Sequence, residues 1–303
     1  MTKTLSRLTI LFLFFGIILS CQQKSVKKEK LQKHVQSQIN AVNGDVAVAF
    51  LNLTDTLDNL FINIDEKFHA ASTMKVPVMI ELFKQHEAGK INLNDSILLV
   101  NKFKSIVDGS LYSIDIGHDS DNDIHKKINT NVALRDLMYN MITVSSNLAT
   151  NALIELVGAN NITATMRDLG AEKIEVLRGV EDQKAYNLGL SNSTTAWDLL
   201  IIFKAIATNK AGDKENCKEM VNILKDQQFN EIIPYHLPKE VEVAHKTGVI
   251  TGLHHDAGIV YLPNGKSYVL VMLSKNLEDF NKGTEQLAEI SKTIYKYVMK
   301  TKN

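Results

Sequence analysis

The hydrophobic pattern of the chain changes period twice, and the order of these changes constrains the fold more than any other feature. Residues 45–53 alternate and are rich in Val, Ala and Leu, which indicates a β-strand, and residues 60–64 would form its hairpin partner. Helical patterns follow, and three strand patterns return near the C-terminus, at 241–249, 256–262 and 267–274. Strands, then helices, then strands predict a mixed α/β (α+β) fold.

The stretch of residues 70–90 carries a first pair of reactive side chains. Apolar residues recur there at three- and four-residue steps, the period of a helix with one buried face, and Ser72 has the character of a residue that begins a first turn. Because residues three apart on a helix are neighbours, Ser72 and Lys75 should project together. A serine hydroxyl is a weak nucleophile until a base takes its proton, and a lysine whose pKa is lowered can be that base. Alternatively, the serine only caps a helix and the lysine lies in solvent.

A second polar group, Ser145-Ser146-Asn147, lies at the break between helical patterns at 132–143 and 146–157. Serine and asparagine often cap the helix that follows such a break, because their short side chains bond to nearby backbone groups. The same position would suit a hydroxyl and an amide held beside a nucleophile. The residues alone leave both interpretations open.

The loop expected at 101–130 is long and irregular, and such loops are usually functional or flexible. Asp119, Asp121 and Asp123 copy the opening of a calcium-binding loop. However, Ile124 stands where that motif needs glycine, and the glutamate at its last position is missing. We therefore expect a solvated acidic loop and no metal site.

The N-terminus has the charged, apolar and small-residue order of a secretory signal. Lys3 and Arg7 precede the apolar run 8–19, which is shorter than the roughly 20 residues of a membrane-spanning helix. The tetrapeptide ILSC, which ends at Cys21, resembles the cleavage box of bacterial lipoproteins, in which the cysteine carries the lipid. We expect residues 1–20 to be a signal peptide and Cys21 to be the lipid attachment site, with an ordinary cleaved signal as the alternative.

Residues 21–34 are polar and rich in lysine, so we expect a lipid-anchored tether that does not pack. If Cys21 is lipidated, Cys217 has no disulfide partner, and the exported protein must be stabilised by its core. Lysine and arginine together number 34, as do aspartate and glutamate, so no long-range field favours nucleic acid as a partner. The expected location is the periplasm or cell envelope of a bacterium, at a membrane to which the lipid on Cys21 holds the protein.

Three short motifs follow one another in a fixed order: Ser72-x-x-Lys75, Ser145-x-Asn147 and Lys246-Thr247-Gly248. They stand on a helix, at a helix joint and on a strand before a hairpin. With these motifs the chain resembles the penicillin-recognising serine enzymes, and most closely the class A β-lactamases. The resemblance covers nearly all of the chain after the N-terminal segment and includes residues 141–158.

The resemblance implies a catalytic domain of two lobes over residues 35–303. An antiparallel sheet flanked by the N- and C-terminal helices would be formed by residues 35–70 and 229–303, and an all-helical lobe, residues 71–228, would be inserted between them. The site would lie in the cleft between the lobes. The resemblance also implies that no metal and no organic cofactor is needed, and we expect a monomer.

The resemblance assigns the reacting groups residue by residue. Ser72 would attack the substrate carbonyl and become acylated, and Lys75 would accept its proton or orient the group that does. Ser145 would relay a proton to the leaving nitrogen. The backbone N–H groups of Ser72 and Val249 would form the oxyanion hole, which usually supplies a large share of acyl-transfer catalysis.

The same resemblance assigns the substrate contacts. Asn147 would hydrogen-bond the substrate amide, and Lys246 and Thr247 would bind the substrate carboxylate. Gly248 would let its strand approach closely, because glycine has no side chain. The expected substrate is therefore a small β-lactam that carries a carboxylate.

Two departures from the family pattern bear on the chemistry. Ser146 occupies the middle of the second motif, where class A enzymes usually carry aspartate. These enzymes also carry an arginine, a glutamate two residues after it, and an asparagine four residues after the glutamate. In this chain Glu181 comes three residues after Arg178, and the residue four after Glu181 is Ala185. Glu181 or Asp182 could hold a hydrolytic water in a reshaped loop, or both acids could pair with Arg178 and only hold the loop.

Three functions use these motifs. The first is a serine β-lactamase, which hydrolyses the β-lactam amide through an acyl-enzyme on Ser72. The second is a related penicillin-binding D,D-peptidase or other serine acyl hydrolase, and the third is a lipoprotein that binds β-lactams covalently with poor deacylation. They differ in whether a base activates water against the acyl-enzyme. A small exported chain with no extra wall-binding segment favours the first.

Overall fold

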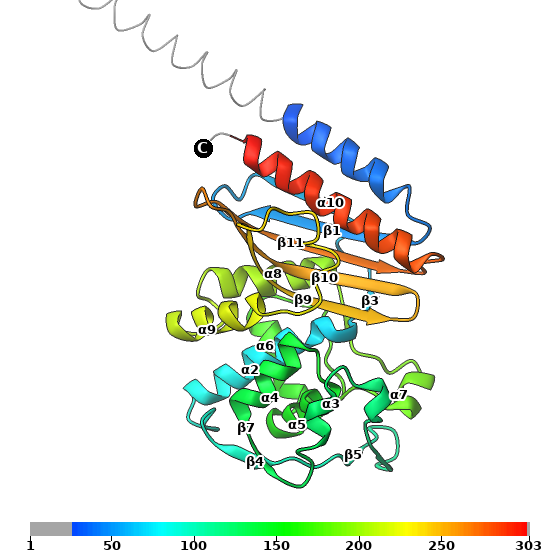
Figure 1. The fold of residues 1–303 in the computed structure, drawn as a ribbon, viewed down its shortest axis with the longest axis vertical. Helices are drawn as coiled ribbons and strands as arrows, with labels where there is room; N and C mark the ends of the chain where they lie inside the picture. The colour runs from blue at the N-terminus through cyan, green and yellow to red at the C-terminus, as the bar shows by residue number, and fades with distance from the viewer. Residues whose placement is uncertain (1–25, 302–303) are drawn as a thin grey trace, which may run out of the picture.

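A five-stranded antiparallel sheet lies in the upper half of the protein in the computed structural model, which describes residues 26–301 (Figure 1). Its strands stand in the order β2-β1-β11-β10-β9, so strands from the two ends of the chain are neighbours. The bounds are Asp45–Asn52 (β1), Asn59–Ile62 (β2), Glu242–Ile250 (β9), Leu253–Tyr261 (β10) and Ser267–Lys275 (β11). The predicted antiparallel sheet and mixed α/β class are confirmed.

Strand β1 shows why the sheet is covered on both faces. Every residue of this strand after Asp45 is buried. Successive side chains of a strand point to opposite faces, and a strand that is apolar on both faces must lie between two layers. Alternate residues of β1 accordingly join two separate apolar clusters, Val46, Val48 and Phe50 in one and Ala47, Ala49 and Leu51 in the other.

Two helices cover one face of the sheet and lie side by side in Figure 1, a helix over residues 26–39 and α10, Phe280–Lys300. The expectation of a tether that does not pack over residues 21–34 is wrong for residues 26–34, which are helical and pack on the sheet. Its buried residues are four apart and form one apolar stripe, Leu31, Val35 and Ile39. The many lysines of this segment made its helical spacing of apolar residues hard to recognise in the sequence.

The opposite face of the sheet is covered by α8, Ala196–Ala207, while α9, Lys214–Lys225, packs beside β9. The remaining helices of the helical lobe lie below these two in Figure 1. A single apolar cluster joins this face of the sheet to α8 and to the interior of the helical lobe, so the two lobes share one core. The helices of the lobe are α2 (Lys75–Glu87), α3 (Asn122–His125), α4 (Leu134–Thr143), α5 (Asn147–Val157), α6 (Ala159–Asp168), α7 (Gln183–Asn187) and α9 (Lys214–Lys225).

The helical lobe also contains strands, which corrects the expectation of an all-helical lobe. The extended segments that flank its loops pair with one another, because unpaired backbone N–H and C=O groups are costly to bury. The two ladders join β4 (Ser96–Leu98) to β7 (Asn131–Ala133) and β5 (Phe103–Lys104) to β6 (Leu111–Tyr112). A third ladder joins β3 (Phe68–His69), just before Ser72, to β8 (Ser193–Thr194).

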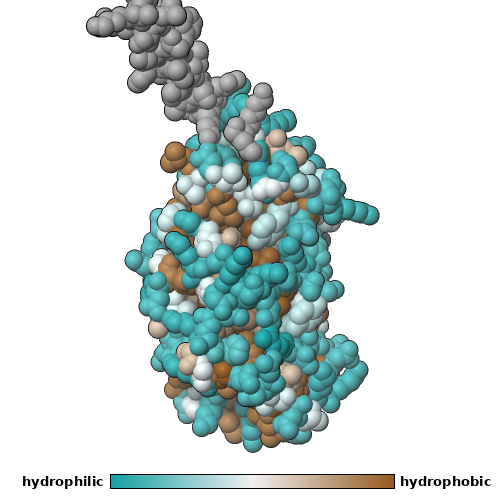
Figure 2. Space-filling view, turned by 90° about the vertical axis from the view of Figure 1, so that its left-hand side faces the viewer, coloured by the Kyte–Doolittle hydropathy of each residue, from teal (hydrophilic) through white to brown (hydrophobic). Residues whose placement is uncertain are grey.

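No helix within residues 26–301 is both long and apolar enough to cross a membrane. The expected signal peptide, residues 1–20, and the expected lipid site, Cys21, lie outside the described residues. The side of the molecule drawn in Figure 2 is mostly hydrophilic, and its hydrophobic residues are scattered in small groups.

Candidate active site

Ser72 lies in a short 3₁₀ helix, η1 (Ala71–Met74), directly before α2. The expected helix start at Ser72 is wrong in detail, because no side chain caps η1 and α2 begins at Lys75. The cause is Ala71, whose left-handed φ of 44° turns the chain sharply before the serine. The Ala71 N–H donates to His69 Nδ1 at 3.0 Å and so helps to hold this turn. Ser72 is therefore free of a capping role and lines a cleft.

Lys75 is fully buried, and its Nζ donates to three oxygens at the start of α5. It lies 2.7 Å from the carbonyl oxygen of Ser145, 3.1 Å from Ser145 Oγ and 3.0 Å from Asn147 Oδ1. Burial lowers the pKa of Lys75 to about 7, although the charges of Asp119 and Glu181 oppose this shift. At neutral pH this lysine is a mixture of amine and ammonium, so it can accept or donate a proton.

The second motif forms the joint between α4 and α5, as the sequence predicts. Ser146 is the N-cap of α5, and its Oγ accepts from the Ala149 N–H at 3.2 Å. Ser145 is buried and has a left-handed φ of 59°. Its Oγ lies 3.1 Å from Lys75 Nζ and 3.1 Å from Lys246 Nζ, so one hydroxyl joins two lysines from different elements.

Strand β9, at the edge of the sheet, brings the third motif against η1. A Cβ at Gly248 would lie 3.1 Å from the backbone nitrogen of Ser72, so only glycine allows this approach without a shift. Lys246 is fully buried, whereas Thr247 and Val249 line the cleft. Burial and the neighbouring Lys75 cation hold the pKa of Lys246 well below its ordinary value, against the charge of Asp256.

A buried carboxylate from another part of the chain holds the second motif. The Asp119 side chain is 0% exposed, and its two oxygens accept from the backbone N–H groups of Asn147 and Leu148, each at 2.9 Å. Asp121 is buried as well and is the N-cap of α3. The expectation of a solvated acidic loop is therefore wrong for these two aspartates, because each accepts N–H groups that have no partner within their own helix.

Glu181 lies beside the cleft, and α5 fixes the residue before it. Asn151 Oδ1 accepts from the Val180 N–H at 2.6 Å, and Asn151 Nδ2 donates to the Val180 carbonyl at 3.0 Å. Glu181 has a left-handed φ of 62° and an exposed side chain. Its carboxylate has no hydrogen-bond or ion-pair partner within residues 26–301, and it lines the same cleft as Ser72.

Asp182 and Arg178 hold the loop around Glu181. Asp182 accepts from Ser105 Oγ and from the Ile106 N–H, each at 3.0 Å, and is the N-cap of α7. Burial raises the pKa of Asp182, but these bonds together with Arg178 leave it below its ordinary value. Arg178 donates to two backbone carbonyl oxygens of the same loop. Of the two acids, Asp182 braces the loop and Glu181 is the open carboxylate.

These elements surround a cleft of about 610 Å³, and a second hollow of about 340 Å³ adjoins it. Ser72, Asn147, Glu181 and Val249 line both. The hydroxyls of Ser72 and Ser145 and the free carboxylate of Glu181 therefore line one space, and the buried Lys75 reaches it through its bond to Ser145 Oγ. Such a set can attack a carbonyl, move a proton to a leaving group and activate water.

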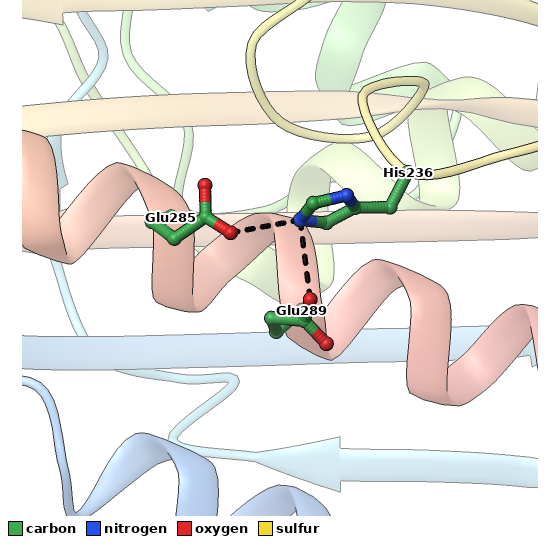
Figure 3. A group of neighbouring side chains, drawn as sticks. All are labelled: His236, Glu285 and Glu289. Carbon is green, nitrogen blue, oxygen red and sulfur yellow. Dashed lines mark hydrogen bonds and ion pairs between the residues drawn. The ribbon is translucent and has the colours of Figure 1, made fainter.

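One group among the described residues has the spacing of metal ligands, namely His236, Glu285 and Glu289 (Figure 3). His236 Nε2 lies 2.9 Å from Glu285 Oε1 and 3.2 Å from Glu289 Oε1. Lys292 Nζ lies 2.7 Å from that same Glu289 oxygen, so a cation already neutralises this carboxylate. We interpret the group as an ion-pair cluster that ties the loop before β9 to α10 at the rim of the cleft.

Two residues of the site, Asp119 and Asn151, were missed at the level of sequence. Asn151 stands four residues after Asn147 on α5, so it shares a face with the second motif, and this spacing is the signal that could have revealed it. Asp119 has no comparable signal, because its bond to Asn147 spans 28 residues.

Comparison with known proteins identifies relatives over nearly the whole chain. The model of the β-lactamase enzyme family matches residues 29–298. β-Lactamase VEB-1 of Pseudomonas aeruginosa is 22% identical over 306 residues, which cover 96% of this chain and 97% of that protein. The extended-spectrum β-lactamase PER-1 of Pseudomonas aeruginosa is 24% identical over 294 residues, 92% of this chain and 90% of that protein. The solved structure of PBP-A has a TM-score of 0.78 at 25% identity and covers 90% of this chain and 97% of that chain.

The fold and the order of the three motifs define the penicillin-recognising serine class. Within that class, the chain belongs to the β-lactamase enzyme family, since the family model matches most of its length. The resemblance to class A β-lactamases inferred from the motifs is confirmed.

Proposed function

We propose that the protein is a serine β-lactamase, which hydrolyses the β-lactam amide through an acyl-enzyme on Ser72. The observation that carries this proposal is that Ser72 and the unpartnered carboxylate of Glu181 line the same cleft. A nucleophile alone makes an acyl-enzyme, whereas hydrolysis also needs a base that can reach a water beside it. Glu181 is an open carboxylate at this place, and Asp182 is not.

In acylation, the Lys75 amine takes the Ser72 hydroxyl proton, directly or through a water, as the serine oxygen attacks the β-lactam carbonyl carbon. The oxyanion that forms accepts from the N–H groups of Ser72 and Val249. The C–N bond then breaks, and the leaving nitrogen takes a proton from Ser145 Oγ. Lys75 Nζ, 3.1 Å from that oxygen, returns the proton, so the proton lost by Ser72 ends on the substrate nitrogen.

In deacylation, Glu181 takes a proton from a water that attacks the ester carbonyl. The ester C–O bond breaks and the proton held by Glu181 passes to the Ser72 oxygen, through water or the Lys75 amine. This step regenerates the hydroxyl and the carboxylate and releases the opened β-lactam. Asn147 would bind the substrate amide, and Thr247, with Lys246 beneath it, the substrate carboxylate. A substrate carboxylate beside Lys246 would oppose the lowering of its pKa, since an anion favours the ammonium form.

A penicillin-binding D,D-peptidase is the second candidate. The likeness to PBP-A favours it, and so does the Glu181 loop, whose spacing departs from the class A pattern. A protein that only captures β-lactams covalently would use the same groups up to the acyl-enzyme.

Intact mass after mixing with a chromogenic cephalosporin, measured together with product formation, separates these functions. A β-lactamase gives a transient Ser72 adduct and continuous product. A stable adduct with one equivalent of product would identify a peptidase or a covalent binder. Absence of any adduct and of any product would refute all three.

We further propose that the protein is exported to the periplasm or cell envelope and is held at a membrane through a lipid on Cys21. The proposal rests on the signal-like residues 1–20 and the ILSC box. Residues 26–39 are helical and pack on the sheet, so a tether in this protein would lie before residue 26. The protein would act there as a monomer on small β-lactams.

A further inference from the structure

Asp119 belongs to none of the three motifs, yet both of its carboxylate oxygens are used at the site. Oδ1 accepts from the backbone N–H of Asn147 at 2.9 Å and of Asp121 at 3.2 Å. Oδ2 accepts from the backbone N–H of Leu148 at 2.9 Å and from His125 Nε2 at 3.1 Å. Because its side chain is 0% exposed, these donors replace water as partners of the charge.

Two of these bonds act on the residues that follow Ser145. The first N–H groups of a helix have no partner within it, and the positive end of the helix favours a carboxylate. Ser146 Oγ accepts from the Ala149 N–H, so Asp119 supplies the acceptors for the first two N–H groups of α5. Ser145 precedes them with a left-handed φ of 59°, and the carboxylate therefore fixes the backbone from which the Ser145 hydroxyl projects.

The charge of Asp119 also acts on Lys75. Burial lowers the pKa of Lys75, and Asp119 is the charged group that opposes this most, ahead of Glu181. The path is short, because Lys75 Nζ bonds to Asn147 Oδ1 at 3.0 Å while the Asn147 N–H bonds to Asp119. A carboxylate here favours the ammonium form of Lys75.

We propose that Asp119 is a positioning residue of this site, whose carboxylate takes the place of the aspartate that class A enzymes carry at the position of Ser146. The proposal rests on the proposed function, because it concerns acylation of Ser72. Asp119 acts through the second motif and through Lys75. Asp119 replaces that aspartate in space and not in sequence, because its carboxylate contacts the start of α5 although Asp119 precedes Asn147 by 28 residues.

The test measures single-turnover acylation of Ser72 against pH, with a chromogenic β-lactam and the full chain. We expect Asp119→Asn to acylate about 10- to 100-fold more slowly at neutral and higher pH, because an amide cannot accept all of these N–H groups. The acidic limb of the profile should move to lower pH, because the Lys75 amine forms at lower pH once the carboxylate is removed. Asp123→Asn is the matched control, an exposed aspartate of the same segment paired with Lys126, and should keep the wild-type rate and limb.

The other titratable groups around Lys75 and Asp119 are Glu181, Lys246, Asp121 and His125. Of these, histidine is the type that ordinarily titrates near neutral pH. His125→Gln removes this imidazole and should keep the wild-type acidic limb. If His125→Gln loses the acidic limb of the acylation profile, that limb belongs to His125. This result would overturn the part of the proposal in which Asp119 acts on the pKa of Lys75.

Thr195→Ala distinguishes positioning from loss of stability. It removes the N-cap of α8, a helix with no residue that lines the cleft, so it should lower the melting temperature without moving the acidic limb. The proposal is overturned if Asp119→Asn has the wild-type rate and acidic limb, or if it only lowers the melting temperature as Thr195→Ala does. If Asp119→Asn does not fold, Asp119→Glu is measured instead, and a wild-type rate with the displaced carboxylate would also overturn the proposal.

Whether the wild type forms a Ser72 adduct shows which of the two proposals has failed, the proposed function or the role of Asp119. If the wild type forms no Ser72 adduct, the proposed function fails and this proposal fails with it. If the adduct forms and Asp119→Asn acylates normally, only the role of Asp119 is refuted.

Discussion

Lys75 Nζ lies 2.7 Å from the carbonyl oxygen of Ser145, which is 70 residues further along the chain. The contact joins the start of α2 to the joint between α4 and α5, so the first two motifs are held as one unit. The same Nζ lies 3.1 Å from Ser145 Oγ, and proton transfer between the motifs therefore needs no rearrangement. The chemistry of the site follows from this relationship.

Acylation by the wild type should rise with pH through the region near 7. In the proposed mechanism the Lys75 amine is the base, and burial lowers the pKa of Lys75 to about 7, so the competent fraction grows as the ammonium loses its proton. Stopped-flow acylation with a chromogenic cephalosporin measures this. Lys75→Arg stays charged and should lose at least about 100-fold in rate together with the rise. A wild-type rate that is flat across this range would contradict the assignment.

Lys246→Ala should weaken substrate capture more than it harms folding. A charge-assisted hydrogen bond in a partly dry site contributes roughly 1.5–3 kcal/mol, which is about one to two decades in acylation efficiency. The substitution also removes a buried side chain and its bonds to Ser145 Oγ and the Thr247 carbonyl, so the melting temperature should fall, but by less than the loss of acylation efficiency would imply if the protein were merely unfolding. Lys239→Ala, at an exposed position before the same strand, is the control. An unchanged acylation rate with a carboxylate-bearing β-lactam would rule out the role.

Glu181→Gln should acylate on Ser72 and then stall, because a general base for water typically contributes about 10²–10⁴-fold. Intact mass should show a stable adduct while the wild type turns over. Asp182→Asn tests the neighbouring acid, and it should lower the melting temperature, since Asp182 holds Ser105 and the Ile106 N–H. Turnover of Glu181→Gln at the wild-type rate would make Glu181 only a loop residue.

Cys21→Ala should leave the protein soluble or unprocessed, because the lipid would have no attachment site. Membrane fractionation and the mass of the mature N-terminus measure this against the wild type. A soluble wild type with an unmodified N-terminus would refute the anchor. The catalytic proposal would be unaffected, since it depends on residues of the folded domain.

The three motifs and the order of strands and helices could be predicted because each depends on local spacing. The bounds moved by a few residues, as in β10, which begins at Leu253 and not at the expected residue 256. An N-terminal helix was expected from residue 35, but residues 26–34 of it were assigned to a tether, because their lysine-rich composition was given more weight than the four-residue spacing of the apolar side chains. The left-handed backbone of Ala71 has no signature in an alanine, so the sequence could not place the turn before Ser72.

Contacts between distant segments were the other source of error. Asp119 and Asp121 were expected in solvent, since an acidic cluster is usually hydrated when its sequence neighbours are polar. Asp119 accepts from N–H groups at the start of α5, and Asp121 caps α3 and also accepts from Asn140 Nδ2 of α4. Only the three-dimensional structure reveals the donors from α4 and α5.

The left-handed residues at the site limit which substitutions this protein can accept during evolution. Seven non-glycine residues within 26–301 have a left-handed φ, and four of them are asparagines, which tolerate that conformation. The other three are Ala71, Ser145 and Glu181, one in each of three segments that border the reaction. Each costs about 1–2 kcal/mol that the rest of the fold must offset. Glycine at these positions would relieve the strain but free the reacting groups, so selection for stability and selection for rate act on them in opposite directions.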